Sequence, residues 1–271
     1  MVQLRGRHRR QVSASQASVP PSLLVRYGNF LFHWRNKLFP VVLLSLFFIF
    51  RPKLLGGDLR LDRWLDAAGV LLALGGQVLR VAVIGYVYII RGGKNERIYA
   101  EDLVTGGFFS HSRNPLYLGN ILVLFGLFLI HNNPWVYIIG VPFFVIGYVA
   151  IVAAEEAYLR GMFGAAYDEY ARDVPRWFPR LKGLRASIGG MTFNWRRVVL
   201  KEYGSTFAWT LGAIVIMTAE TLIYSSYREN TVFLNALWIC LAILAIAYST
   251  VRYLKLTRRL RIPATPAAPV A

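Results

Sequence analysis

Two long apolar runs, separated by a short polar break, occupy residues 115–158. They read PLYLGNILVLFGLFLI, then HNNP, then WVYIIGVPFFVIGYVAIVAAEEAY. A helix that crosses a bilayer needs about 20 mainly apolar residues. The sequence therefore predicts two antiparallel transmembrane helices, over 115–131 and 134–158, joined as a tight hairpin.

The same apolar pattern recurs four times outside this hairpin, at 37–51, 64–90, 204–225 and 232–253. Composition agrees, since the 271 residues are 56% apolar and 17% charged, with a mean hydropathy of +0.44. A soluble domain carries about 25% charged residues. A soluble enzyme, a disulfide-built secreted domain and a disordered chain are excluded. We expect an all-α fold, a polytopic integral membrane helical bundle with about six transmembrane helices.

Basic residues account for the formal net charge of +17, and they gather in alternate loops. The segments 1–37, 91–113 and 160–203, with the tail from Lys255, hold 24 Lys and Arg, whereas the other connections hold five. Basic loops mark the cytoplasmic side of a membrane and attract anionic lipids. We expect both termini to be cytoplasmic, a bacterial inner membrane as the location, membrane lipids as partners, and no binding to nucleic acid.

The first motif, LVTGGFFSHSRNPLYLGN, occupies residues 103–120. Asn114 is a good N-cap and Pro115 fits the first helical position. The positive end of the helix dipole would then face the cytoplasm beside Arg113, where it can receive an anion. Gly119 permits the close approach of a ligand or of another helix.

The second motif begins with EEAYLRGMFG at residues 155–164 and continues through Tyr167 and Tyr170 to VPRWFP at 174–179. Its carboxylates can neutralise a cation, and its rings can stack on one. The same residues are also compatible with a plain interfacial belt of aromatic and basic side chains.

Together the two motifs resemble those of the isoprenylcysteine carboxyl methyltransferase family, whose wider group includes membrane phospholipid methyltransferases. The family pattern is L-V-T-x-G-x-(Y/F) and R-(H/N)-P-x-Y-x-G, followed after a hairpin by E-E-x-x-L-x-x-x-F-G-x-x-Y-x-x-Y-x-x-x-V-P. The match covers about residues 103–179. Asn114 stands where many members have His, and Arg176 follows the Val-Pro pair, so a prenylated protein substrate of the eukaryotic type is not implied.

The resemblance implies S-adenosylmethionine (SAM) as methyl donor, bound at the cytoplasmic membrane face, and a lipophilic acceptor. No GxGxxG follows a strand, so the SAM site must be built from helices. The implied SAM contacts are Asn114, Pro115, Tyr117, Leu118, Gly119, Glu155, Glu156, Tyr167, Tyr170, Pro175 and Trp177.

The acceptor is expected to undergo carboxylate O-methylation or lipid amine N-methylation. Arg113 or Arg176 would hold an acceptor carboxylate, and Glu156 would be the base for an amine. Asn120 and Leu124 would line the acceptor passage. No metal-ligating set is predicted.

These expectations divide the chain into five segments. They are a basic N-terminal cytoplasmic segment (1–36), two transmembrane helices (37–90), a methyltransferase core (91–185), an interfacial segment with two further transmembrane helices (186–253), and a disordered basic and Pro-containing tail (254–271). Small residues in the last two helices predict packing against the core or a homodimer. They are Gly204, Ser205, Ala208, Gly212 and Ala213. Arg80 and Glu220 are charges within spans that would pair with each other.

Two other functions are compatible with parts of the sequence. The first is an NADPH-dependent reductase of the sterol or steroid 5α-reductase type, because such enzymes share the Pro-x-Tyr-x-Gly turn with this chain. Steroid 5α-reductase relatives usually carry Glu after that glycine, whereas this chain has Asn120. A non-enzymatic membrane scaffold or transporter would also contain charged residues within spans, but the recognisable chemistry here gathers at one membrane face and no internal repeat is present.

Overall fold

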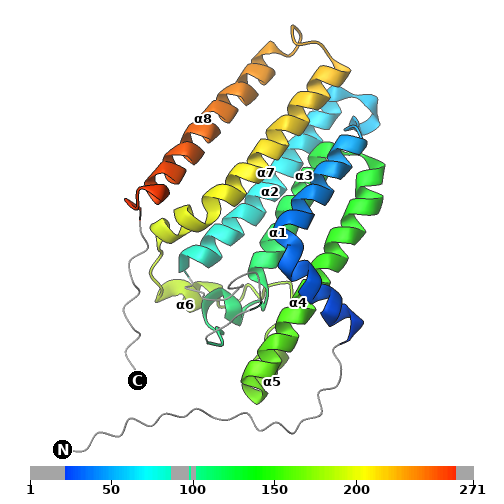
Figure 1. Ribbon diagram of the computed structural model, residues 1–271. Coiled ribbons are helices and arrows are strands. Elements are labelled where there is room, and N and C mark those ends of the chain that lie inside the picture. Colours follow the sequence, from blue (N-terminus) through cyan, green and yellow to red (C-terminus); the bar gives the residue numbers. More distant parts are fainter. Residues whose placement is uncertain (1–21, 87–97, 99–101, 261–271) are drawn as a thin grey trace, which may run out of the picture.

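The computed structural model describes residues 22–86, 98 and 102–260, and within them it contains helices and no strands. Six long helices lie side by side, with two short helices below one end of the bundle (Figure 1). The long helices are α1 (Leu23–Ile49), α2 (Leu59–Tyr86), α3 (Pro115–His131), α4 (Val141–Phe163), α7 (Trp195–Tyr224) and α8 (Thr231–Leu256). The short elements are α5 (Ala165–Asp173), α6 (Leu184–Gly189), the 3₁₀ turns η1 (Leu55–Gly57) and η2 (Gly107–Ser110), and the π turn η3 (Val136–Gly140).

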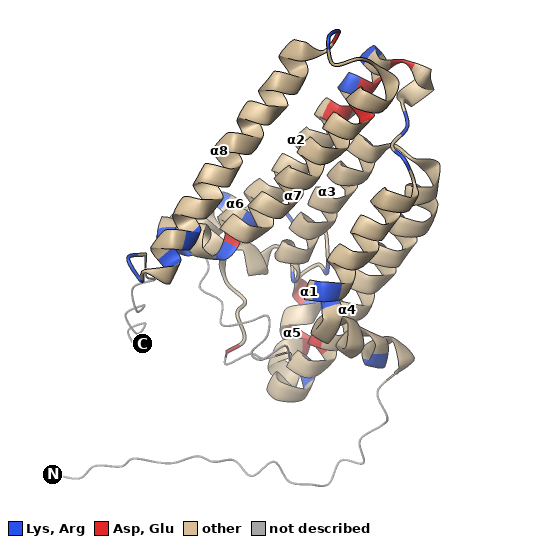
Figure 2. Ribbon diagram, turned by 45° about the horizontal axis from the view of Figure 1, so that its top comes forward, with Lys and Arg blue, Asp and Glu red and all other residues tan. Residues whose placement is uncertain are grey.

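Length and composition make this bundle a membrane bundle, which confirms the predicted fold class. Four helical segments are long and apolar enough to cross a bilayer: 59–86, 136–163, 195–224 and 231–256. The apolar α3 is shorter, and α1 begins at Leu23, well before the expected span at 37. Charged residues gather toward the two ends of the bundle and leave its middle largely uncharged (Figure 2). The number of crossings stays a prediction.

Helices α2 and α3 pack backbone to backbone through two pairs of glycines. A Cβ atom on Gly76 would lie 2.5 Å from the carbonyl oxygen of Gly119, and one on Gly69 would lie 2.6 Å from that of Gly126. Gly69 and Gly76 are one heptad apart on α2, and Gly119 and Gly126 are one heptad apart on α3, so the glycines form a continuous seam. Small residues are what allow helices in lipid to approach this closely. The partner that approaches Gly119 closely, as predicted, is therefore helix α2.

The hairpin between α3 and α4 is as tight as the sequence predicts. Asn132 ends α3 in the left-handed region at φ 45°, and its side chain donates to the carbonyl of Lys53. The Asn133 side chain donates to the carbonyl of Arg51 at 2.7 Å. The polar break thus also anchors the connection between α1 and α2 at this end of the bundle.

Two apolar clusters hold the helices together. The first joins α1, α3 and α4 around Phe39, Phe128 and Phe144. The second joins α2, α3, α7 and α8 around Trp209 and Leu234. The start of α1 and the end of α8 lie at the same end of the bundle as α5 and α6 (Figure 1).

Candidate active site

The chain segment that leads into α3 runs beside the segment that follows α5. The amide of Arg113 donates to the carbonyl of Pro175 at 2.9 Å, and the Ser112 hydroxyl donates to the carbonyl of Trp177 at 2.9 Å. Asn114 occupies the N-cap position, but its side chain does not cap the helix; it donates to the carbonyl of Arg176 at 3.1 Å. These bonds bring the two sequence motifs into one site.

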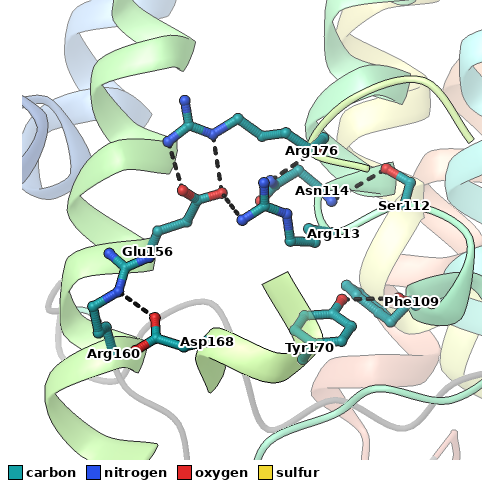
Figure 3. A network of polar contacts seen from close by, with 9 residues as sticks. All are labelled: Phe109, Ser112, Arg113, Asn114, Glu156, Arg160, Asp168, Tyr170 and Arg176. Atoms are coloured by element: carbon teal, nitrogen blue, oxygen red, sulfur yellow. Dashed lines mark hydrogen bonds and ion pairs between the residues drawn. The ribbon is translucent and has the colours of Figure 1, made fainter. Parts of the chain in front are cut away.

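Glu156 on α4 is the centre of an ion-pair cluster that joins these two segments (Figure 3). Its carboxylate accepts two hydrogen bonds from Arg176, at 3.0 and 2.5 Å, and pairs with Nη1 of Arg113 at 3.2 Å. The bonds to Glu156 raise the pKa of the Arg176 guanidinium, so Arg176 keeps its charge across the working pH range. Both carboxylate oxygens of Glu156 are thus engaged by guanidinium groups.

Glu155, the neighbouring acid, has different surroundings. It is 4% exposed, and its Oε1 accepts a hydrogen bond from the Tyr117 hydroxyl at 2.8 Å. That hydroxyl in turn accepts from Arg35 of α1 at 3.2 Å. The chain of contacts links α4, α3 and α1 at the end of the bundle where α3 begins.

A cavity of about 1040 Å³ extends from this polar end between α1, α3, α4 and α7. Its size lies at the upper end of ordinary ligand sites, which measure about 300–1,000 Å³. Seven of the predicted site residues line it: Arg113, Asn114, Pro115, Tyr117, Asn120, Leu124 and Glu155. Apolar side chains form much of the remaining wall, among them Phe39, Leu43 and Phe47 of α1, Leu127 of α3, and Phe207 and Leu211 of α7.

The other predicted site residues lie outside the cavity wall. Glu156 and Arg176 form the ion-pair cluster beside it, and Gly119 packs against Arg80 and Gly76. Tyr167 is fully buried with Leu159 and Val174, where it packs α5 onto α4. The hydroxyl of Tyr170 donates to the carbonyl of Phe109 at 2.8 Å. Leu118, Pro175 and Trp177 are likewise absent from the residues that line the cavity.

Arg80 is a cavity residue that the sequence did not assign to the site, and its expected partner is wrong. It does not pair with Glu220 but with Glu202 of α7, through Nε at 2.8 Å and Nη2 at 2.6 Å. A further hydrogen bond runs from Nη1 to the Asn120 side chain, which the sequence placed in the acceptor passage. The sequence marks Arg80 by its charge within an expected span. Glu202 was not predicted as its partner, because Glu202 precedes the expected span at 204–225.

Arg35 and Tyr148 also line the cavity and were not singled out. Arg35 belongs to a run of basic residues before the first expected span, where it is indistinguishable from a lipid-facing arginine. Tyr148 lies within an apolar run, and its ring is 5.6 Å from that of Tyr117.

Most of the small residues of α7 face the cavity. Gly204, Ser205, Ala208 and Gly212 line it, and Gly212 also lies against Leu127 of α3. Ala213 is buried in the second apolar cluster, as a packing role requires. Helix α7 therefore forms one wall of the candidate site.

Comparison with known proteins identifies the part of this bundle that is shared with them. The phospholipid methyltransferase family matches residues 64–166, from α2 into α5. The cobalt-zinc-cadmium resistance protein CzcN of Cupriavidus metallidurans is 29% identical over 218 residues, 79% of this chain and 94% of that protein. Protein-S-isoprenylcysteine O-methyltransferase of Xenopus laevis is 29% identical over 141 residues, 47% of this chain and 45% of that protein.

The human protein-S-isoprenylcysteine O-methyltransferase is 27% identical over 139 residues, 48% of this chain and 47% of that protein. The chain thus spans less than half the length of these two methyltransferases. No solved structure gives a significant match.

The fold and the motifs define a membrane methyltransferase. The family match and the two relatives support the isoprenylcysteine carboxyl methyltransferase-like group, which the two motifs predict. The comparisons favour this class over the reductase and over the scaffold or transporter.

Proposed function

We propose that the protein transfers a methyl group from SAM to a lipophilic acceptor at the cytoplasmic membrane face. The observation that carries the proposal is the cavity, which has charged and polar side chains at one end and apolar walls from three helices. An acceptor with a polar head and an apolar tail matches that division. SAM would supply an electrophilic methyl on its sulfonium, and the acceptor oxygen or nitrogen would displace the neutral thioether.

The polar end of the cavity has the groups that SAM requires. Glu155 offers a carboxylate for the ammonium or the sulfonium, and the rings of Tyr117 and Tyr148 are next to it. The first turn of α3 offers free N–H groups and the positive end of the helix dipole for the SAM carboxylate. We place the donor here rather than against Tyr167 and Tyr170, because those side chains are buried in the packing of α5.

Arg113 is the proposed contact for the acceptor head. It lines the cavity, and its Nε has no hydrogen-bond acceptor among the described residues. Glu156 holds its Nη1 in place. Positioning of this kind can supply about 7–11 kcal/mol of the barrier to a two-reactant displacement. Full turnover by folded Arg113→Ala and Glu156→Ala variants would contradict these roles.

The proposed orientation puts the site and both termini in the cytoplasm. The support is the excess of basic loops on that side and the shared end of the bundle at which α1 begins and α8 ends. Reporter fusions at residues 57 and 228 should report the side opposite to fusions at 100, 185 and 265. Opposite results for 100 and 185 would rule out a single cytoplasmic site.

The activity is tested with purified full-length protein, labelled SAM and membrane lipid extract. We expect a labelled lipid product, identified by mass analysis, that is lost in Glu155→Gln and kept in Arg228→Ala at the other end of the bundle. Mild alkali separates the two chemistries, because it cleaves a methyl ester but not an N-methyl group. SAM, but not NADPH, should raise the thermal unfolding midpoint. No product and no stabilisation by SAM would overturn the proposal.

We also propose a homodimer through the last two helices. The support is the largely exposed surface of α8, which packs on α7 at the edge of the bundle. Cys240, the single cysteine, is exposed on α8 and gives a native cross-linking site. Thiol cross-linking in membranes should yield dimers, and their absence together with a monomeric mass in detergent would exclude this interface.

A further inference from the structure

Three buried carboxylates meet at the end of the bundle opposite to the candidate active site. They are Asp62 and Asp66 of α2 and Glu220 of α7, with exposures of 1%, 2% and 0%. One oxygen of each lies within 4.8 Å of the others. Asp62 and Arg80 are about 27 Å apart along α2, from the rise of an α-helix. Red and blue ribbon segments mark this end in Figure 2.

The oxygens of this cluster lack the partners that buried carboxylates require. Both oxygens of Glu220 and both of Asp66 have no hydrogen-bond partner in the part of the chain that the structure describes. Oδ2 of Asp62 has none either, whereas Oδ1 accepts from the amide of Leu55 at 2.8 Å. The fully buried Glu220 side chain is thus directed at two aspartates, and a hydrogen bond to Asp62 would require a proton on one of the two carboxylates.

Among the described residues, one cationic side chain lies beside the three carboxylates. Arg63 supplies one positive charge, with Nη1 3.8 Å from Asp66. Its Nη2 donates to the Thr221 hydroxyl at 2.9 Å, and its guanidinium lies over the ring of Phe233. Three ionised carboxylates beside one guanidinium would carry a formal charge of −2, which a membrane bundle tolerates only with a bound cation or with protons on the carboxylates.

We propose that Asp62, Asp66 and Glu220 bind one divalent cation of the hard, oxygen-liganded class, such as Mg²⁺, Mn²⁺ or Ca²⁺. Carboxylate oxygens are the ligands that this class prefers, with water in the remaining positions. The ion would balance the charge and join α2 to α7 at one end, as the Arg80–Glu202 pair joins them at the other. The site is separate from the methyl-transfer site and takes no part in the reaction.

Manganese is the probe, added to chelator-treated, full-length protein without a histidine tag in detergent. Loss of the free Mn²⁺ electron paramagnetic resonance signal should show one site per chain. Asp66→Asn and Glu220→Gln should each weaken binding at least about tenfold, since each removes a ligand charge. Glu229→Gln changes an exposed acid at the same end of the bundle and should leave binding unchanged. No binding, or equal binding by all variants, would overturn the site and leave Asp62 and Glu220 sharing a proton.

A second measurement keeps the carboxylates intact and covers variants that do not fold. In a Cys240→Ala background, nitroxides are placed at Arg228→Cys, beside the cluster end, and at Lys182→Cys, at the other end; both positions are exposed. Bound Mn²⁺ should broaden the label at 228 more than the label at 182. Equal broadening, or none, would overturn the proposal. Methyl transfer by the same samples tests the proposed function separately, because the inferred site does not depend on it.

Discussion

Arg80 of α2 and Glu202 of α7 form a two-point ion pair, with Nε 2.8 Å from Oε2 and Nη2 2.6 Å from Oε1. Gln77 also donates to Glu202, and Trp209 donates to Gln77, so the pair is embedded in a buried network. Arg80 lies inside the segment that matches the phospholipid methyltransferase family, residues 64–166, and Glu202 lies outside it. Helix α7 is therefore joined to the segment that matches the family at a residue of the cavity wall.

Removal of one member of this pair should destabilise the protein more than removal of both. Glu202→Leu leaves a largely buried guanidinium without its partner, at a cost of about 3–5 kcal/mol. The double variant Arg80→Met with Glu202→Leu removes both charges, and its thermal unfolding midpoint in detergent should lie above that of Glu202→Leu. Because Arg80 lines the cavity, methyl transfer should be low in both variants. A stable double variant with full turnover would confine Arg80 to a structural role.

The two adjacent glutamates should respond differently to the same change. Glu155→Gln should weaken SAM binding about 10- to 100-fold, since a hydrogen bond to a charged group contributes about 1.5–3 kcal/mol. Glu156→Gln should lower turnover more than SAM affinity, because Glu156 holds Arg113 and Arg176. Calorimetry with purified variants measures both affinities. Unchanged affinity when both residues are replaced by Gln would refute the proposed donor site.

Adjacent glycines on α2 offer a matched test of the helix seam. Gly76→Ala would put a Cβ 2.5 Å from the carbonyl oxygen of Gly119, and such overpacking costs about 1–3 kcal/mol. Gly75 is exposed, and a Cβ added to it would meet no atom within 4 Å, so Gly75→Ala should stabilise the helix by about 0.5–1 kcal/mol. Thermal unfolding in detergent should therefore shift in opposite directions. A shift of the same sign for both would disprove the backbone contact.

The bounds of a helix could be predicted from the sequence where neighbouring residues determine them. The Asn114–Pro115 start and the His131–Asn133 end give α3 bounds that agree with the expected 115–131. The first helix was harder, because residues 23–36 are polar enough to suggest a loop but continue α1. The Ser22 hydroxyl accepts from the amide of Val25, which is a capping signal that hydropathy alone does not register.

The site was predictable at its polar end and not along its walls. Arg113, Tyr117 and Glu155 belong to motifs, and the structure brings them together. Arg80 and Glu202 are separated by 122 residues, and a contact of that range leaves no periodic signal in either helix. Gly212 and Ala208 have the small side chains expected of a helix interface, but the same property makes room for a ligand. The Asp62–Asp66–Glu220 cluster was not predicted for the same reason as the Arg80–Glu202 pair, because it joins residues that are far apart in the sequence.

The last prediction concerns access of the acceptor tail to the cavity. Leu124 of α3 and Ala208 of α7 line it, so Leu124→Trp and Ala208→Phe should fill the space that an acyl or prenyl tail would occupy. We expect at least about tenfold lower turnover of a long-chain acceptor, as one or two lost methylene contacts already change discrimination by about 1–3 kcal/mol. SAM affinity should be unchanged, because neither side chain is at the polar end. Ala236→Phe, at an exposed position of α8, is the matched control and should keep full activity. If a water-soluble acceptor turns over as fast as any lipid, and the bulky variants do not slow it, the cavity walls do not receive the tail, and access between the helices is wrong.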